Sequence, residues 1–169
     1  MLRRPEPNEA APYYFGVINQ VPGDDVVGVL ETQLDETLAF LSGVSEDKSL
    51  HRYAPGKWSM REALNHINDV ERVTLFRALW FARGFASALP SFEQIPCAAA
   101  AEADRRSWAS HIEEFRAIRL ASVAFFKNLG GEAWDRRGVA SDNPFTVRAL
   151  AYIVAGHTTH HVAIFKERY

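Results

Sequence analysis

Gly156-His157-Thr158-Thr159-His160-His161 lies near the end of a long apolar segment and decides how the chain is interpreted. Three of the six histidines of this 169-residue sequence fall within it. On a helix with about 100° per residue, His157 and His161 fall about 20° on either side of the centre of the apolar stripe, taken at Leu150. His160 falls about 80° away by the same arithmetic. The pattern predicts that His157 and His161 point into the core and that His160 lies on its flank.

A pair of inward-facing imidazoles indicates a metal site. Packing explains such a pair poorly, because each ring carries a donor and an acceptor that need partners. Imidazole is the commonest metal ligand in proteins, and histidines four residues apart project from one face of a helix. His66 is the natural third ligand, since Val70 and Val73 fall within about 40° of it in helical phase. The sequence therefore predicts a divalent-metal site at His66, His157 and His161.

Four further polar residues are candidates for positions around this site. Glu62 and Asp69 lie about one turn before and after His66, where a carboxylate orients an imidazole or a water, and Glu62 is equally suited to a capping role. Arg77 falls about 20° from His66 in phase and either binds an anionic substrate group or forms an ordinary salt bridge, the commoner arrangement. His160 is expected to face solvent or to neighbour the site rather than to act as a ligand.

The rest of the chain contains long segments with helical patterning, separated by loops rich in Gly, Pro and Ser. We find no alternating strand pattern of useful length, no internal repeat and no linker that would divide the chain. The sequence predicts an all-α protein with a four-helix bundle, formed by one domain over residues 13–169 after a loose, Pro-rich N-terminal tail over residues 1–12. The predicted helices run from Val26 to about Leu41, from Ser59 to about Ala82, from Trp108 to about Leu129, and from the cap residue Thr146 to about Lys166.

Composition limits the classes of partner. The net charge of −2 gives no electrostatic argument for binding nucleic acid or an anionic membrane. No apolar run approaches membrane-spanning length, and the N-terminus lacks the apolar core of a signal peptide. A single cysteine, Cys97, excludes an internal disulfide framework and suits a reducing compartment. We expect a soluble, cytoplasmic protein in which His51 and His111 are surface residues and Cys97 is not a nucleophile.

Two stretches resemble the DinB-like family. The first is Lys57–Glu71, in which a Trp-Ser pair is followed by Glu62 and then by His66 with an acidic residue close behind. The second is Thr146–His161. The resemblance implies an up-down-down-up four-helix bundle that binds a divalent metal through three histidines. Carried over residue by residue, those ligands are His66, His157 and His161, the same three that helical phase selects.

The same resemblance implies several activities. Characterised relatives include thiol-dependent S-transferases and a mycothiol-dependent isomerase, and a related domain binds iron in sulfoxide synthases. The expected cofactors are therefore a divalent ion (Zn, Ni or Fe) and, for a transferase, a low-molecular-weight thiol that the metal activates before it attacks an electrophile. Family members often form homodimers, and the expected ligand is a small-molecule substrate. The alternatives are a metal-dependent hydrolase and a non-catalytic metal-binding or stress-related protein. A transferase requires an open cleft leading to the metal, whereas a structural site is closed over.

Overall fold

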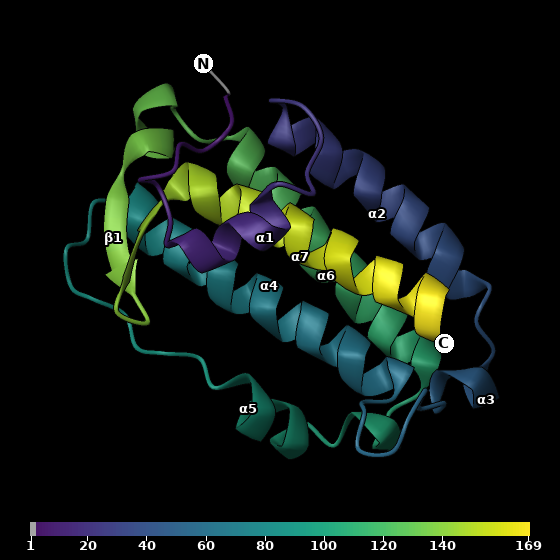
Figure 1. The fold of residues 1–169 in the computed structure, drawn as a ribbon. Coiled ribbons are helices and arrows are strands. Elements are labelled where there is room, and N and C mark those ends of the chain that lie inside the picture. Colours follow the sequence, from purple (N-terminus) through teal and green to yellow (C-terminus); the bar gives the residue numbers. More distant parts are fainter. Residues whose placement is uncertain (1–2) are drawn as a thin grey trace.

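The computed structural model describes residues 3–169, and four long helices dominate it (Figure 1). Their ends agree with the predicted ends to within about two residues, so the predicted all-α four-helix bundle is confirmed. Each helix begins where a side-chain oxygen accepts a hydrogen bond from a backbone N–H three residues further on, which satisfies one of the free donors of the first turn. The helices and their capping residues are α2 (Val26–Ser42, Asp25), α4 (Met60–Ala82, Ser59), α6 (Trp108–Lys127, Ser107) and α7 (Val147–Arg168, Thr146).

The order and direction of the helices follow from pairs of residues that meet. α2 and α4 each contact both α6 and α7. Although α2 and α4 are successive long helices in the chain, they therefore occupy opposite corners of the bundle. α2 runs parallel to α7 and antiparallel to α6, and α6 runs parallel to α4, which gives the up-down-down-up order. The pairs are Gln33–Ala155 and Phe40–Phe165 for α2 and α7, Leu41–Trp108 and Glu31–Lys127 for α2 and α6, and Asn68–His111 and Glu71–Arg119 for α4 and α6.

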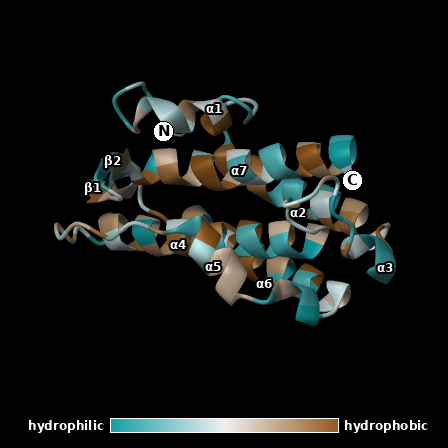
Figure 2. Cartoon of the chain, turned by 60° about the horizontal axis from the view of Figure 1, so that its bottom comes forward, coloured by the Kyte–Doolittle hydropathy of each residue, from teal (hydrophilic) through white to brown (hydrophobic). Residues whose placement is uncertain are grey.

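The core consists of two apolar clusters with a polar layer between them. One cluster fills the end of the bundle near the start of α7, and the other fills the end near the start of α4. Figure 2 shows the long helices as mixtures of polar and apolar residues, as expected for helices that bury one face, whereas α3 (Glu46–Ser49) is mainly polar. The layer between the clusters takes one residue from each long helix: Gln33, Glu71, Arg119 and Thr158.

A short hairpin precedes α7, in a stretch where the sequence shows no alternating strand pattern of useful length. β1 (Arg137–Ala140) pairs antiparallel with β2 (Asn143–Thr146). Ser141 and Asp142 form the turn with φ values of 51° and 58°, which is the backbone that a two-residue hairpin turn with the right twist requires. Four-residue strands that contain a glycine and a proline carry too little alternation to be recognised in the sequence.

Shorter helical segments cover the bundle. Two of them, η1 (Pro12–Tyr14) and α1 (Phe15–Ile18), lie across α7 in Figure 1. Besides α3, the others are α5 (Gln94–Ala100), η2 (Ala103–Arg105) and η3 (Gly131–Asp135). Within residues 3–169, no helix combines the length and the apolar character needed to cross a membrane.

The N-terminal segment packs against the bundle where the sequence predicts a loose tail. Glu9 is buried and accepts hydrogen bonds from Thr146 Oγ1 (2.7 Å) and Arg148 Nη1 (3.1 Å). The Arg4 guanidinium donates to the backbone carbonyl of Ile18 at 3.1 Å. The partners of Glu9 lie more than 130 positions further along the chain, so local composition does not reveal these contacts. Residues 1–2 of the predicted tail lie outside the described part of the chain.

Candidate metal centre

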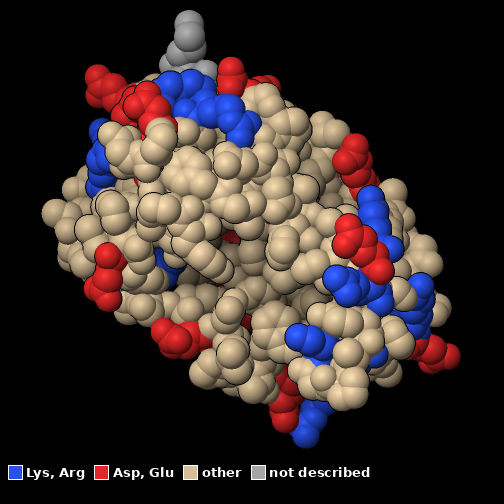
Figure 3. All heavy atoms as spheres, viewed as in Figure 1, with Lys and Arg blue, Asp and Glu red and all other residues tan. Residues whose placement is uncertain are grey.

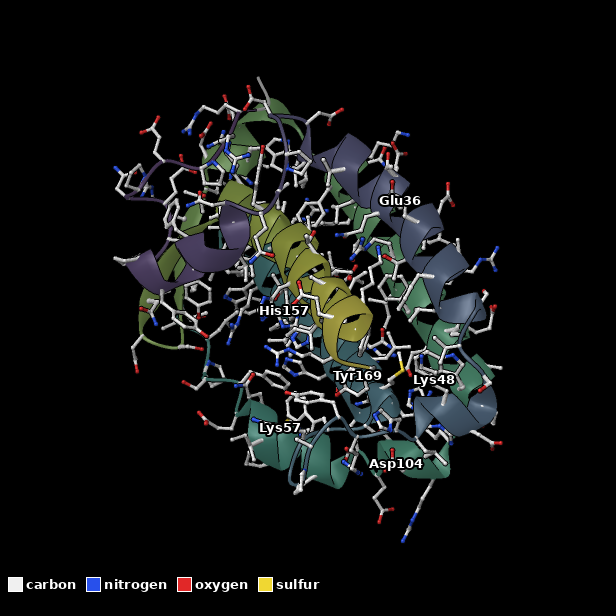
Figure 4. The ribbon with its side chains drawn as sticks, turned by 45° about the vertical axis from the view of Figure 1, so that its right-hand side comes forward. Glu36, Lys48, Lys57, Asp104, His157 and Tyr169 are labelled. Carbon is white, nitrogen blue, oxygen red and sulfur yellow. The ribbon has the colours of Figure 1, made fainter. Side chains whose placement is uncertain are left out.

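The structure brings His66 of α4 together with His157 and His161 of α7. One ring nitrogen from each histidine lies within 4.8 Å of the other two, and the Nε2 atoms of His66 and His157 are 3.2 Å apart. The ring centroids are 5.0, 5.1 and 4.5 Å apart for the three pairs. Figure 4 shows His157 on the side of α7 that faces α4, close to other nitrogen-bearing side chains. Within residues 3–169 this is the one group of three potential metal ligands that meet in this way.

The geometry and the charge state of the three rings suit a metal ion. Two imidazole nitrogens bound to one tetrahedral zinc ion lie about 3.3 Å apart, given Zn–N bonds of about 2.0–2.1 Å. Burial lowers the pKa of His66 to about 4 and that of His161 to about 3, and it places the pKa of His157 well below its ordinary value. The rings are therefore neutral near pH 7, which is the form that coordinates a metal.

The aromatic side chain of Trp58 covers His66. The Trp58 ring lies 4.9 Å from the His66 ring, centroid to centroid. The Tyr169 hydroxyl donates a hydrogen bond to the Trp58 carbonyl at 2.6 Å, and both side chains line a cavity of about 330 Å³ that reaches His161. Trp58 immediately precedes the cap of α4, and this position gives no local sign that its ring packs on His66.

The two predicted neighbouring carboxylates have other partners. Glu62 completes the capping box of α4: its carboxylate accepts from the Ser59 N–H at 2.8 Å, and it also pairs with Arg52. Asp69 accepts from Asn65 Nδ2 at 2.8 Å. Among the described residues, neither carboxylate forms a hydrogen bond with an imidazole of the cluster. Glu62 thus has the structural role that the sequence analysis left open.

The remaining two candidates line a larger cavity beside the cluster. His160 is exposed, and its ring centroid lies 5.3 Å from that of His161. Arg77 donates from Nη2 to the Pro90 carbonyl (3.0 Å) and to Ser141 Oγ (2.9 Å). No carboxylate of residues 3–169 lies within 4.0 Å of its guanidinium, so the expected salt bridge is absent there.

This larger cavity has a volume of about 520 Å³, and His157 and His160 form part of its lining. Its walls come from η1 and α1, from α4, from residues 92–94 at the start of α5, from the hairpin and from α7. Figure 3 looks onto this face, where the surface is hollowed and mostly uncharged atoms surround the hollow. The volume is in the range of small-molecule sites. The cluster is therefore open to this cavity through His157.

Gly156 permits the close approach of α1 to this part of α7. A Cβ atom at position 156 would lie 2.2 Å from the carbonyl oxygen of Val17, a separation that no folded chain tolerates. Val17 also lines the cavity. A glycine inside a helix costs about 1 kcal/mol relative to alanine, so the residue before His157 is small for a packing reason.

The polar layer of the core lies directly beside the cluster. The fully buried Arg119 guanidinium donates to both carboxylate oxygens of Glu71 at 2.9 Å and to the hydroxyl of Thr158 at 2.9 Å. Because Thr158 follows His157 in the chain, this network fixes the rotation of α7 and with it the direction of His157 and His161. The network leaves no local signal in the sequence, because its members are scattered over all four helices.

One histidine that the sequence analysis places on the surface is buried. His111 has no exposed area, and its Nε2 lies 2.9 Å from the Ala103 carbonyl oxygen. Burial lowers the pKa of His111. Its position under η2 depends on a loop contact that helical phase does not predict.

Comparisons with known proteins agree with this architecture. The structure is similar to YfiT from Bacillus subtilis, described as a probable metal-dependent hydrolase with an unusual four-helix bundle topology (TM-score 0.75, 17% identity, 85% of this chain and 83% of that chain). It is also similar to the mycothiol-dependent maleylpyruvate isomerase (TM-score 0.70, 9% identity, 90% of this chain and 66% of that chain). No curated protein matches the sequence significantly. The sequence model of the DinB superfamily matches residues 30–165, most of the chain, and the protein therefore belongs to the DinB superfamily.

Proposed function

We propose that this protein is a metal-dependent enzyme for a small-molecule substrate, with His66, His157 and His161 as the ligands of a divalent ion such as Zn, Ni or Fe. The observation that carries the proposal is the meeting of three neutral imidazoles, one of which, His157, lines a 520 Å³ cavity. Three protein ligands leave a coordination position for a reactant, which is typical of catalytic rather than structural sites. An open cavity argues against the non-catalytic alternative.

The reaction that we propose is transfer of a low-molecular-weight thiol to an electrophile. When bound, the ion supplies a Lewis acid that lowers the pKa of a thiol or of a water molecule. The chain provides two approaches to the cluster: the larger cavity reaches His157, and the smaller cavity beside Trp58 and Tyr169 reaches His161. Two approaches suit a reaction of two substrates. The similarity to a protein whose name includes dependence on mycothiol adds support.

Hydrolysis is the second candidate. It needs only water and one organic substrate at the same three imidazoles, and the similarity to YfiT, described as a probable metal-dependent hydrolase, favours it. The two reactions are separated by their requirement for a thiol.

We also propose a homodimer in a reducing compartment. The lone, partly buried Cys97 suits such a compartment. Phe76, Leu79 and Phe85 form exposed apolar surface near the end of α4 and suit a contact with a second copy. Sedimentation of the wild type beside Phe76→Ser tests the dimer, which we expect to dissociate in the variant.

Metal content is the first test. We expect close to one divalent ion per chain in purified, untagged wild type, measured by elemental analysis. The variants His66→Ala, His157→Ala and His161→Ala should lose it, whereas His160→Ala, on the same turn of α7 but exposed, should retain it. If the wild type holds no metal and takes none up on reconstitution, the proposal is wrong.

Turnover is the second test. Metal-loaded protein is incubated with an activated aryl halide or an aryl ester, with and without glutathione, mycothiol or bacillithiol, and products are identified by mass spectrometry. A thiol adduct that forms in the wild type and not in His157→Ala supports transfer. Ester cleavage without any thiol supports hydrolysis and contradicts the transferase assignment.

A further inference from the structure

Arg77 differs from the other buried arginines of the described chain. Arg61, Arg119 and Arg148 each pair with a carboxylate, at 2.6, 2.9 and 3.1 Å. The Arg77 residue is only 9% exposed, yet within residues 3–169 no carboxylate lies within 4.0 Å of it. A buried charge without a counter-ion is costly, and proteins normally supply one. The environment of Arg77 therefore suits a guanidinium whose counter-ion is an anion bound from solution.

The neighbours of Arg77 do not neutralise it. Its Nη2 donates to the Pro90 carbonyl and the Ser141 hydroxyl, which are both neutral, and Nε and Nη1 make no hydrogen bond with the described residues. Burial raises the pKa of the Tyr14 phenol, so this nearby hydroxyl is uncharged near pH 7. Glu93 lines the same cavity but is exposed and lies beyond ion-pair distance.

The position of Arg77 relates it to the imidazole cluster. It lies on the same face of α4 as His66 and about 16 Å further along the helix axis, at about 1.5 Å per residue. Both Arg77 and His157 line the 520 Å³ cavity, and Val70, Thr74 and Ile153 line the stretch between them. Arg77 is the one lysine or arginine among the described residues that line this cavity. The lining of the cavity therefore differs along its length: Arg77 supplies a cation at one end of this stretch, and His157, one of the proposed metal ligands, lies at the other.

We propose that Arg77 and Ser141 form an anion subsite, and that the substrate of this cavity carries a carboxylate at the end remote from its reacting atoms. A guanidinium with free N–H donors matches a carboxylate in shape and charge, and a single cation balances one negative charge rather than the two of a phosphate monoester. Val70 and Ile153 between Arg77 and His157 suit a hydrocarbon or aryl spacer. That the other end of the substrate reacts at the imidazole cluster rests on the proposed function, whereas binding of the carboxylate at Arg77 does not.

The test uses metal-free protein, so that anion binding is measured independently of the metal. The probes are 4-phenylbutyrate and trans-cinnamate, each compared with its neutral amide by titration calorimetry. We expect the carboxylates to bind the wild type at least about tenfold more tightly than the amides, a difference of about 1.4 kcal/mol. Arg77→Gln should bind acid and amide equally weakly. Arg83→Gln, which removes an exposed arginine six residues further along, should bind like the wild type.

A second variant, Arg77→Lys, and a measurement of folding by circular dichroism keep the test valid if Arg77→Gln misfolds. Arg77→Lys keeps the charge without the planar fork and should bind the carboxylates with intermediate affinity. If Arg77→Gln does not fold, as judged by circular dichroism, the comparison of acid with amide in the wild type and in Arg77→Lys decides the question.

Three results would overturn the anion subsite: equal binding of acid and amide by the wild type, unchanged carboxylate affinity in folded Arg77→Gln, or no binding of either carboxylate up to millimolar concentration. Loss of stability in Arg77→Gln with unchanged carboxylate affinity would mean that Arg77 only ties Pro90 to Ser141. A protein that binds the carboxylates but no metal would retain this subsite and lose the proposed function.

Discussion

At the scale of single residues, Gly156 determines how closely α1 covers the cavity. Its lack of a side chain lets the backbone of Val17 cross α7 one residue before His157. Any larger residue must push α1 outward, and because Val17 lines the cavity, this shift also changes the approach to His157. The unfavourable helix propensity of this glycine is thus offset by a close contact between the backbones of α1 and α7.

We expect Gly156→Ala to destabilise the protein by about 1–3 kcal/mol, even though alanine is the better helix former, because overpacking against a backbone carbonyl outweighs helix propensity. Urea unfolding followed by circular dichroism measures the change. Gly16→Ala is the matched control: a Cβ atom at that position meets nothing within 4 Å, so its stability should not fall. Equal stability of Gly156→Ala and wild type would contradict the packing role of Gly156.

At the scale of helices, the polar layer fixes how the four helices are rotated against one another. Gln33, Glu71, Arg119 and Thr158 come from four different helices and satisfy one another's hydrogen-bonding groups. An apolar core tolerates rotation of a helix more readily than a buried ion pair does, because a broken pair leaves an uncompensated charge.

Glu71→Ala should therefore cost about 3–5 kcal/mol, since it leaves the Arg119 guanidinium buried without its carboxylate. The matched control is Glu113→Ala on α6, whose exposed pair with Arg116 should contribute less than about 1 kcal/mol. Chemical denaturation of both variants gives the comparison. A cost for Glu71→Ala as small as that for Glu113→Ala would show that the layer does not hold the helices.

The sequence predicts the long helices well because their signals are local. A side-chain cap such as Ser59, followed by an apolar stripe of the right period, specifies a start and a buried face without reference to the rest of the chain. The hairpin before α7 and the packing of Glu9 were not predicted. The hairpin strands are too short to show alternation, and Glu9 finds its partners near the far end of the chain.

The candidate site was predictable to a similar degree and for the same reason. Helical phase places His157 and His161 on one inward face, and the structure brings His66 to them. Phase alone could not show that Trp58 packs on His66, nor that Arg77 lacks a carboxylate. Both facts depend on which loops cover the helices, and loop contacts leave no periodic signal in the sequence.

At the scale of the whole molecule, the buried imidazoles make the stability of the metal-free protein depend on pH. Burial lowers the pKa of His66 to about 4 in the folded chain, from an ordinary value of 6.5. The unfolded chain therefore binds more protons than the folded chain between these values. The stabilisation associated with a neutral His66 is fully present above pH 6.5 and is lost as the pH falls toward 4.

We expect the unfolding free energy of metal-free wild type to fall by about 2 kcal/mol between pH 7 and pH 5 from His66 alone. Urea denaturation in the presence of a chelator at several pH values provides the measurement. His66→Gln should show a flatter profile, and His51→Gln, which changes an exposed histidine, should follow the wild type. A wild-type profile that is flat over this range would contradict the burial of neutral imidazoles.

The proposed ligands lie far apart along the chain, since His66 and His157 are separated by 91 residues. An ion held by both would therefore act as a removable cross-link between α4 and the last helix. A covalent bridge that closes a loop of about 100 residues restricts the unfolded chain by about 4.7 kcal/mol. An ion that joins the same two points imposes a comparable restriction and disappears with a chelator. The lifetime of the folded chain in the presence of a protease would then follow the supply of metal.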